Sequence, residues 1–516
     1  MGISKDILAV ERPKNTVVHD SHGNGKYRYS VVARTGCVRR TTGNYPVNGG
    51  IVGHIIDGSF VPCAPKVSRR QLTLRRFGDV AVTDHFGKDV LAELMACYDY
   101  KDALKIYCMA LLRICEPNVT CSRLSSAYED SWLSVQYPQV ALSPGTVSSF
   151  VEKLGRDCAG MVSFMRKRLE KVAEDHRIII DGTLKTDDSF VNSLSQFSRK
   201  ARIKGTRDIN IVYAYDADLG EPLCMKVYSG DVLDVTAYRQ FLADMDISSG
   251  ILIADKGFPV SEIRDLLKTG LHYISPLRRN QKLALEHGMY DFNESFVFKG
   301  DKLLGRKESI DGGRFLYSYL DPYRAYLEQA GFIRHLAPGP FDTESRNRRK
   351  DLFGTIVFVS DLDVDLEGMY SLYGTRWDIE LCFKTYKDIL ELSQTRVHSD
   401  YSVIGSELVN FVSSVVSARM ITAFDRAGLL ERQTFRGLMK DFRAIRKYRV
   451  GADEEWSVYQ EAKYKIQMLV DMDLLEGTKT PPKRKRGRTR KVQADAEKTE
   501  PSAAQETPEE GAEAHA

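Results

Sequence analysis

Residues 177–184 read RIIIDGTL, three consecutive isoleucines followed by an acid and a glycine. Short apolar runs of this kind, bounded by turn-forming residues, are typical of strands buried on both faces of a sheet. Two further runs follow, DINIVYAYD at 208–216 and GILIAD at 250–255. The stretch between them, VTAYRQFLADM, has the three- and four-residue apolar spacing of a helix. The sequence therefore predicts an α/β unit built on these strands.

The regions on either side differ in texture. Residues 26–62 alternate short β-type runs with Gly, Asn and Pro turns, whereas residues 88–175 have helical spacing. Within the helical part, Ser143 and Pro144 form a helix start in ALSPGTVSSFVEKLG (141–155). That helix fits either the recognition helix of a helix-turn-helix DNA reader or an ordinary amphipathic helix in a bundle.

Composition excludes several protein classes. The 516 residues are 43% hydrophobic and 28% charged, which suffices for several packed cores. Nine scattered cysteines without a CxxC pair indicate a reducing cytoplasm rather than disulfides or a zinc site. The N-terminus has no apolar leader, and the apolar stretch 404–424 is interrupted by Glu407, Asn410 and Arg419. We therefore expect a soluble cytoplasmic protein with no membrane span.

The net charge of +4 does not by itself indicate a nucleic-acid partner, but the basic residues are locally clustered. KTPPKRKRGRTRK (479–491) carries eight basic residues and no acid, and an acidic segment follows it. Low hydrophobicity and segregated charge predict a disordered tail. The basic part is either a solvated tail or a non-specific contact to DNA phosphates.

Acids stand at the ends of two of the predicted strands. Asp181 follows the isoleucine run and Asp255 ends GILIAD. Carboxylates at neighbouring strand ends converge at one edge of a sheet, and such hard oxygen ligands suit Mg²⁺ or Mn²⁺. Either acid alone is more simply a turn or cap residue. Together with a third acid downstream, they favour a metal site.

That third acid lies in a helical stretch, 373–387, which reads YGTRWDIELCFKTYK. Tyr373, Arg376, Glu380 and Lys387 are spaced by three, four and seven residues, so a continuous α-helix places them on one face. A salt-bridged surface stripe explains Arg376 with Glu380 but not the register of the other two. Trp377 is expected to pack beneath this helix.

These residues resemble the Tyr-x2-Arg-x3-Glu-x6-Lys signature of insertion-sequence transposases of the DDE type, in the broad group around insertion-sequence family four. Asp181-Gly182-Thr183 matches the first aspartate motif of that family, and Asp255-Lys256-Gly257-Phe258 matches the second. The resemblance covers about 176–425.

The resemblance implies a multidomain α/β protein with a ribonuclease-H-like catalytic core, interrupted by a β-rich insertion and preceded by a mixed β/α region. It implies that Asp181, Asp255 and Glu380 are catalytic and ligate two Mg²⁺ (or Mn²⁺) ions. One ion activates water or a 3′-hydroxyl and the other stabilises the leaving oxygen. Tyr373, Arg376 and Lys387 would hold DNA backbone phosphate.

The same resemblance implies partners and a place of action: double-stranded DNA at transposon ends and target, a homodimer or higher oligomer, and the bacterial or archaeal nucleoid. The expected regions are a β-rich N-terminal module (1–87), a helical region that binds DNA ends (88–175), the two halves of the catalytic core (176–279 and 361–425) around the β-rich insertion (280–360), a C-terminal helical region (426–478) and the tail (479–516).

Three other interpretations compete with a transposase. A metal-dependent nuclease on the same fold would cut without joining, and a DNA-binding derivative would do neither, although all three acids are present. IIIDGTL also resembles the D-x-D-G-T motif of haloacid-dehalogenase-type phosphatases, but the nucleophile position is Ile179. Asp187 and Asp188 are expected to be loop acids, and His176 and His272 have no ligand-spaced partner.

Overall fold

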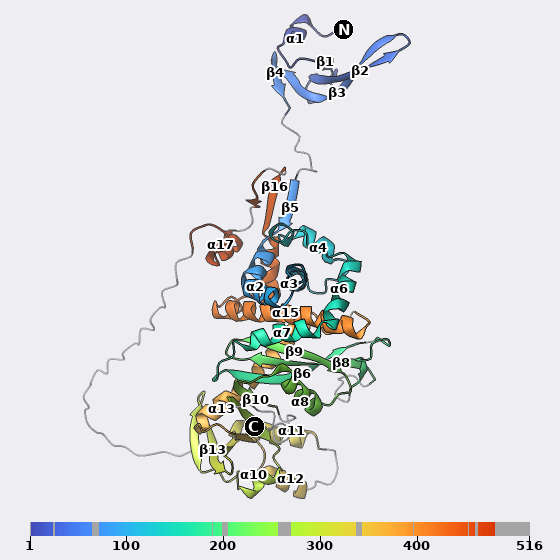
Figure 1. Ribbon diagram of the computed structural model, residues 1–516. Helices are drawn as coiled ribbons and strands as arrows, with labels where there is room; N and C mark the ends of the chain where they lie inside the picture. The colour runs from blue at the N-terminus through green and yellow to red at the C-terminus, as the bar shows by residue number, and fades with distance from the viewer. Residues whose placement is uncertain are drawn as a thin grey trace, which may run out of the picture.

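The computed structural model (Figure 1) describes residues 2–23, 26–63, 72–187, 189–198, 205–255, 270–336, 343–395, 397–451, 454–459 and 463–479. Most of the basic and acidic tail, from residue 480 onward, lies outside these ranges, as do Lys256, Gly257 and Phe258 of the second aspartate motif.

A ten-stranded mixed sheet forms the centre of the fold, which confirms the predicted α/β class. The three apolar runs are strands, and their side chains are buried. The antiparallel part pairs β8 with both β6 and β9, and the parallel part places β10 between β6 and β11. The strands of this half are β6 (Arg177–Thr186), β7 (Gln196–Phe197), β8 (Arg207–Asp216), β9 (Glu221–Ser229), β10 (Gly250–Ile253) and β11 (Leu271–Leu277).

Strand β6 is longer than the sequence predicts. Asp181 does not end it but lies in its middle, because β8 pairs with β6 as far as Thr186. The expectation that Asp181 marks a strand end is therefore wrong. The parallel neighbour β10 ends at Ile253, opposite Ile179 of β6, so Asp255 follows a strand end whereas Asp181 does not.

The strands of the predicted insertion continue the same sheet. β15 pairs with β11 on one side and β14 on the other, and β13 and β12 complete that edge. The region also contains three helices. Its elements are α10 (Lys282–Glu286), β12 (Glu294–Phe298), β13 (Asp301–Ile310), β14 (Arg314–Leu320), α11 (Pro322–Arg334), α12 (Thr343–Lys350) and β15 (Thr355–Ser360).

Helix α15 (Asp400–Arg426) lies between the sheet and the N-terminal helices, as Figure 1 shows. Of the helices in the described ranges, it alone is long and apolar enough to cross a membrane, but 72% of its apolar window is buried within the fold. It packs against α2, α3, α6 and β9. Its hydropathy is thus that of a core helix. The neighbouring helices are α2 (Gly78–Cys97), α3 (Tyr100–Cys115), α4 (Leu124–Asp130), α5 (Leu133–Gln136), α6 (Pro144–Arg156) and α7 (Cys158–Leu169).

Helix α6 is the one considered above as a recognition helix. Ser143 caps it as predicted, with its hydroxyl accepting from the Thr146 N–H at 3.4 Å. A Cβ on Gly155 would lie 1.8 Å from the Tyr401 carbonyl oxygen, and one on Gly405 would lie 1.9 Å from that of Val151. The two backbones therefore touch, so α6 packs closely against α15, and its reading of DNA stays a prediction.

Two smaller sheets flank this body. The N-terminal one has its own core of Val18, Val31 and Ile55. The other pairs β5 with β16, joining the start of the helical region to the C-terminal region, and the expected boundary at residue 87 lies inside α2. Their elements are α1 (Lys5–Ala9), β1 (Thr16–Asp20), β2 (Tyr29–Arg40), β3 (Gly43–Ile56), β4 (Ser59–Pro62), β5 (Leu72–Arg76), α16 (Phe435–Ala444), β16 (Arg446–Val450), β17 (Ser457–Val458) and α17 (Lys463–Asp471).

Candidate active site

Asp181 is held on two sides by hydrogen bonds. Its Oδ1 accepts from the Gly182 N–H at 2.7 Å and from the Tyr238 hydroxyl at 3.0 Å. Tyr238 comes from α8 (Asp234–Met245), and its oxygen also accepts from the Gly182 N–H at 3.1 Å. Burial raises the pKa of Asp181, and these two hydrogen bonds to the ionised form act in the opposite direction. The carboxyl group is thus fixed in orientation within a desolvated setting.

Asp255 lies two residues beyond β10, beside Asp181. In the parallel pairing Ile253 is opposite Ile179, so continuing the register places Asp255 level with Asp181. The Asp255 Oδ1 is 3.3 Å from the Arg376 Nη1, and its side chain is partly exposed. The two aspartates therefore come from neighbouring parallel strands, and an arginine already balances one of them.

The segment that carries Glu380 is not one continuous α-helix. A 3-10 turn separates Tyr373 from Glu380, and a π-helical turn contains Lys387. The continuous α-helix expected over 373–387 is therefore wrong, because the rotation per residue differs between the three helix types, and the prediction of a single face rested on that continuity. The pieces are α13 (Leu366–Gly374), the 3-10 turn η2 (Thr375–Trp377), α14 (Asp378–Lys384) and the π turn η3 (Thr385–Ile389).

The three expected phosphate-binding residues have distinct surroundings. Tyr373 packs on Phe358, with ring centroids 4.2 Å apart, and burial raises the pKa of Tyr373 to about 12. Arg376 pairs with Asp255, as described above. Lys387 is half-buried, and desolvation lowers its pKa, against the opposing effects of several acids that include Glu380. Of these three residues, Arg376 and Lys387 therefore bring cationic groups near the acids.

Trp377 does not pack beneath the helix. Its side chain is 64% exposed, and the Arg376 guanidinium lies 4.8 Å from the centroid of its ring. The expectation for this residue is wrong because the 3-10 turn at 375–377 breaks the helical periodicity on which it rested. An exposed indole thus borders the acid site.

The negative charges of Asp255 and Glu380 both act on Asp181 and raise its pKa. The three predicted acids therefore share one electrostatic site, although 125 positions separate Asp255 from Glu380 in the sequence. Within the described ranges, however, no three His, Cys, Asp or Glu side chains are close enough to hold a metal ion directly. Coulomb forces act over several ångströms, whereas direct ligation of Mg²⁺ needs oxygens at about 2.1 Å.

The donor set nevertheless fits a hard divalent cation. All three groups are carboxylates, Asp181 is desolvated, and Glu380 is exposed. Such oxygen ligands are those that Mg²⁺ and Mn²⁺ prefer, and these cations retain water and substrate oxygens as further ligands. A bound cation would favour the ionised form of Asp181, whose pKa is raised by burial first and by the charges of Asp255 and Glu380 in addition.

A second cluster lies four residues further along β6. The Lys185 ammonium is 2.6 Å from Oε1 of Glu407 in α15 and donates to the Tyr386 hydroxyl oxygen at 3.1 Å. Tyr386 donates to Oε2 of Glu407 at 2.6 Å, and Asn410 donates to Oε1 at 2.9 Å. Lys185 is only 3% exposed. Every charge in the Lys185 cluster (Lys185, Tyr386, Glu407 and Asn410) is thus paired.

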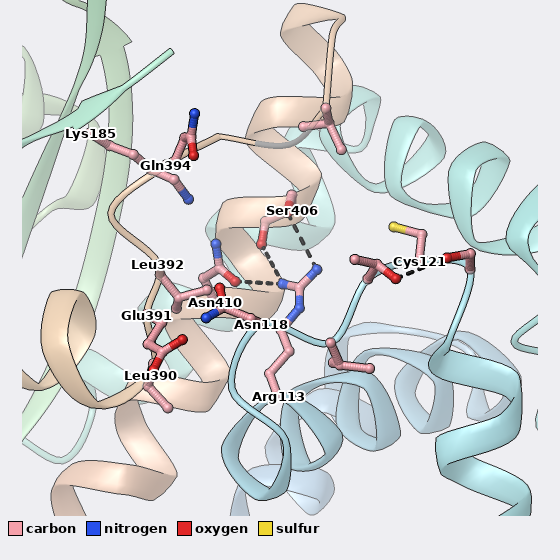
Figure 2. A pocket seen from close by; sticks show the side chains of 14 residues that line it. Arg113, Asn118, Cys121, Lys185, Leu390, Glu391, Leu392, Gln394, Ser406 and Asn410 are labelled. Atoms are coloured by element: carbon pink, nitrogen blue, oxygen red, sulfur yellow. Dashed lines mark hydrogen bonds between the residues drawn. The ribbon is translucent and has the colours of Figure 1, made fainter. Parts of the chain in front are cut away.

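Figure 2 shows the surroundings of this cluster. Lys185 lines a pocket of about 310 Å³ between α15, the end of α3 and the segment that follows η3. Arg113 donates to Asn410 Oδ1 at 2.5 Å and to the Ser406 carbonyl at 3.2 Å. Lys185, Tyr386 and Tyr238 were not identified in the sequence, because their partners lie far away along the chain. The helical spacing of Ala237, Tyr238 and Phe241 was the available signal for a buried tyrosine.

The residues that the sequence analysis set aside have structural roles. Asp187 accepts from the Ser189 N–H at 2.9 Å, as expected of a loop acid, and Asp188 lies outside the described residues. His176 and His272 each face one aspartate, Asp216 and Asp361. All nine cysteines are free.

Comparison with known proteins identifies one family. The family described as "Transposase DDE domain" matches residues 173–403, somewhat less than half the chain, and this range contains all three acids. The match supports transposase function. No curated protein matches the chain. Among solved structures, "Cryo-EM structure of piggyBac transposase synaptic complex with hairpin DNA (SNHP)" has a chain that aligns with 10% identity and a TM-score of 0.37, covering 71% of this chain and 79% of that one. So low a TM-score carries no argument.

Proposed function

We propose that this protein is a DDE transposase that cuts and joins DNA with divalent metal held by Asp181, Asp255 and Glu380. The observation that carries the proposal is the electrostatic convergence of the three acids, two of which raise the pKa of the third. All three fall within the range that matches the transposase DDE domain. Perturbed carboxylates on neighbouring elements are typical of catalytic sites.

The sheet topology supports a ribonuclease-H-like core. The strand order β9-β8-β6-β10-β11 combines three antiparallel strands with two that run parallel to the central β6. The two aspartates lie on β6 and directly after β10. Strands β12 to β15 extend this sheet at its β11 edge, and they represent the β-rich insertion.

The residues of the site have separable roles. Bound Mg²⁺ or Mn²⁺ would supply a Lewis acid for phosphoryl transfer from DNA. Tyr238 and the Gly182 N–H both donate to Oδ1 of Asp181 and so orient the carboxylate. Neither bond uses Oδ2, which would then ligate the metal. Arg376, which balances Asp255 here, would bind a backbone phosphate through its planar guanidinium, and Lys387 would add a point charge. Tyr373, packed on Phe358, would complete this phosphate-binding set.

The substrate and assembly follow from the same proposal. The substrate is double-stranded DNA at the ends of an insertion sequence and at the target, and the helical region 88–175 contributes to end binding. The active form is a homodimer or higher oligomer that pairs two ends at the nucleoid. Trp377, exposed beside Arg376 in the described part of the chain, would stack on a base displaced near the cut.

The test is a Mg²⁺-dependent cleavage and strand-transfer assay on the DNA ends of the element that encodes the chain. Asp181→Asn, Asp255→Asn and Glu380→Gln each remove one charge with little change of shape. We expect each to lose activity by a factor on the order of 10³ or more while still binding the ends. Asp57→Asn, in an exposed turn of the N-terminal sheet, is the matched control and should remain active.

The outcomes separate the rival functions. Cleavage without joining would identify a metal-dependent nuclease on the same fold. End binding without cleavage by the wild-type protein would identify a DNA-binding derivative. Undiminished cleavage in any one of the three acid variants would remove that residue from the site.

A further inference from the structure

The connection between β6 and β8 presents unusually exposed apolar side chains. Phe190 is 86% exposed and Phe197 is 62% exposed, with Val191 also exposed between them. Single exposed apolar residues are ordinary, but neighbouring phenylalanines at this exposure indicate a binding surface. We name Phe190, Phe197 and Arg207 the aromatic platform.

The platform is exposed although its loop is firmly held. Asp187 accepts from the Ser189 N–H and from the Asn192 amide, the latter at 2.5 Å. The Ser193 N–H donates to Oδ1 of Asp400, the first residue of α15, at 2.7 Å. The exposure of the two rings is therefore a property of an anchored loop and not of a fraying one.

A cation completes the platform. The Arg207 guanidinium carbon lies 5.3 Å from the centroid of the Phe190 ring and 5.7 Å from that of Phe197. The same guanidinium donates to the Ser195 carbonyl at 2.7 Å, which fixes it beside both rings. Aromatic faces alternating with cations are the combination that binds unpaired nucleotides, because rings stack on bases and cations contact phosphates.

Charge decides between the possible partners. The sequence up to and including Arg207 reads RKARIKGTR (199–207), with five basic residues and no acid. Arg207 is the described basic residue of this run, and it lies beside both rings. A second copy of this chain would bring its own Arg207 against the first, whereas DNA would offer complementary phosphates.

We infer that Phe190 and Phe197 stack on unpaired bases of the DNA substrate, at a contact separate from the acid site. This stacking role rests on the proposed function, because the DNA substrate is part of that proposal. Strand β6 ends five residues after Asp181, about 16 Å along the strand at 3.3 Å per residue. At 3.4 Å per nucleotide, the platform contacts bases roughly five positions or more from the phosphate at the acid site.

The experiment measures binding of the full-length protein to a fluorescein-labelled DNA duplex with splayed, unpaired arms and to a fully paired duplex of equal length. Phe190→Leu with Phe197→Leu keeps the apolar surface and removes the aromatic rings. We expect this variant to bind the splayed duplex at least about tenfold more weakly and the paired duplex unchanged. Phe190→Trp with Phe197→Trp should retain the preference, and its added fluorescence should be quenched by the splayed arms.

Equal binding of the splayed duplex by the leucine variant and the wild type would overturn the inference. The inference would also fail if the leucine variant bound DNA normally but no longer self-associated in sedimentation, because the platform would then bind a second copy of the chain. If the wild type binds the splayed duplex through these rings but neither cuts nor joins DNA, the transposase proposal fails while the stacking contact stands. If the wild type binds no DNA, both fail.

Discussion

Asp181 and Lys185 stand four residues apart on the same strand, yet their surroundings differ sharply. The Lys185 ammonium donates to the Glu407 carboxylate and to the Tyr386 hydroxyl, and Tyr386 and Asn410 both donate to that same carboxylate. Burial and the negative charges of Asp255 and Glu380 instead raise the pKa of Asp181, and the nearby Arg376 guanidinium lies against Asp255. One strand thus carries a neutralised cluster and an acid site with excess charge.

The difference separates a structural role, that of the Lys185 cluster, from the functional role that we propose for the acids. Buried charges that are fully paired stabilise or specify the fold, because unpaired ones are strongly destabilising. Like charges gathered in one place destabilise the fold unless something binds them. The Lys185 cluster joins β6 to α15 and to η3, and so it holds the π turn of Lys387 near the acids.

The largest expected effect is on the Lys185 cluster. Lys185→Met leaves Glu407 buried without its cation and should lower the free energy of unfolding by about 3–5 kcal/mol. Urea unfolding measures this loss. The double variant Lys185→Met with Glu407→Leu removes both charges and should recover most of the stability. A single variant as stable as the wild type would show that the Lys185 cluster does not hold the fold together.

A smaller effect is expected from metal at the acid site. Mg²⁺ at 100 times its dissociation constant should stabilise the wild-type protein by about 2.7 kcal/mol, because it binds the folded state only. Asp181→Asn should remove most of this stabilisation, whereas Lys185→Met should keep it. Thermal unfolding with and without Mg²⁺ provides the measurement. Equal stabilisation of Asp181→Asn and the wild type would place the cation elsewhere.

The smallest expected effect is the pH dependence of the metal-free protein. Because the pKa of Asp181 is raised above its ordinary value of 3.8, this group favours the folded state at low pH and loses that contribution as pH rises through the raised pKa. Asp181→Asn should therefore gain stability relative to the wild type as the pH increases towards neutrality. Unfolding in chelator across this range measures the difference. A relative stability that is flat with pH, or that falls, would contradict the raised pKa of Asp181, to which burial contributes most.

Much of the central sheet could be predicted from the sequence. The apolar runs at 177–181, 208–216 and 250–255 are buried strands, because long hydrophobic stretches are stable only in the interior. The end of β6 could not be predicted in the same way. Hydrogen bonding to β8 sets its length, and the polar residues after Asp181 continue the strand because they find partners such as Glu407.

The helical signature was predicted less accurately. Regular spacing placed Tyr373, Arg376, Glu380 and Lys387 on one face, but the 3-10 and π turns interrupt the helix. The π turn contains Tyr386, whose hydroxyl is bonded to both Lys185 and Glu407. Tertiary contacts to two distant elements therefore accompany the departure from α-helical geometry, and local sequence carries no record of such contacts.

The sequence by itself determined the α/β class and the identity of the three candidate acids, because hydrophobic runs and motif spacing are local properties of the chain. Only the tertiary structure decided which partner each charged group has: Lys185 pairs with Glu407, Asp255 pairs with Arg376, and Asp181 accepts a hydrogen bond from the hydroxyl of Tyr238. The physical reason is that electrostatic energy depends on distance and burial, and both are fixed only when strands and helices far apart in the chain are packed together.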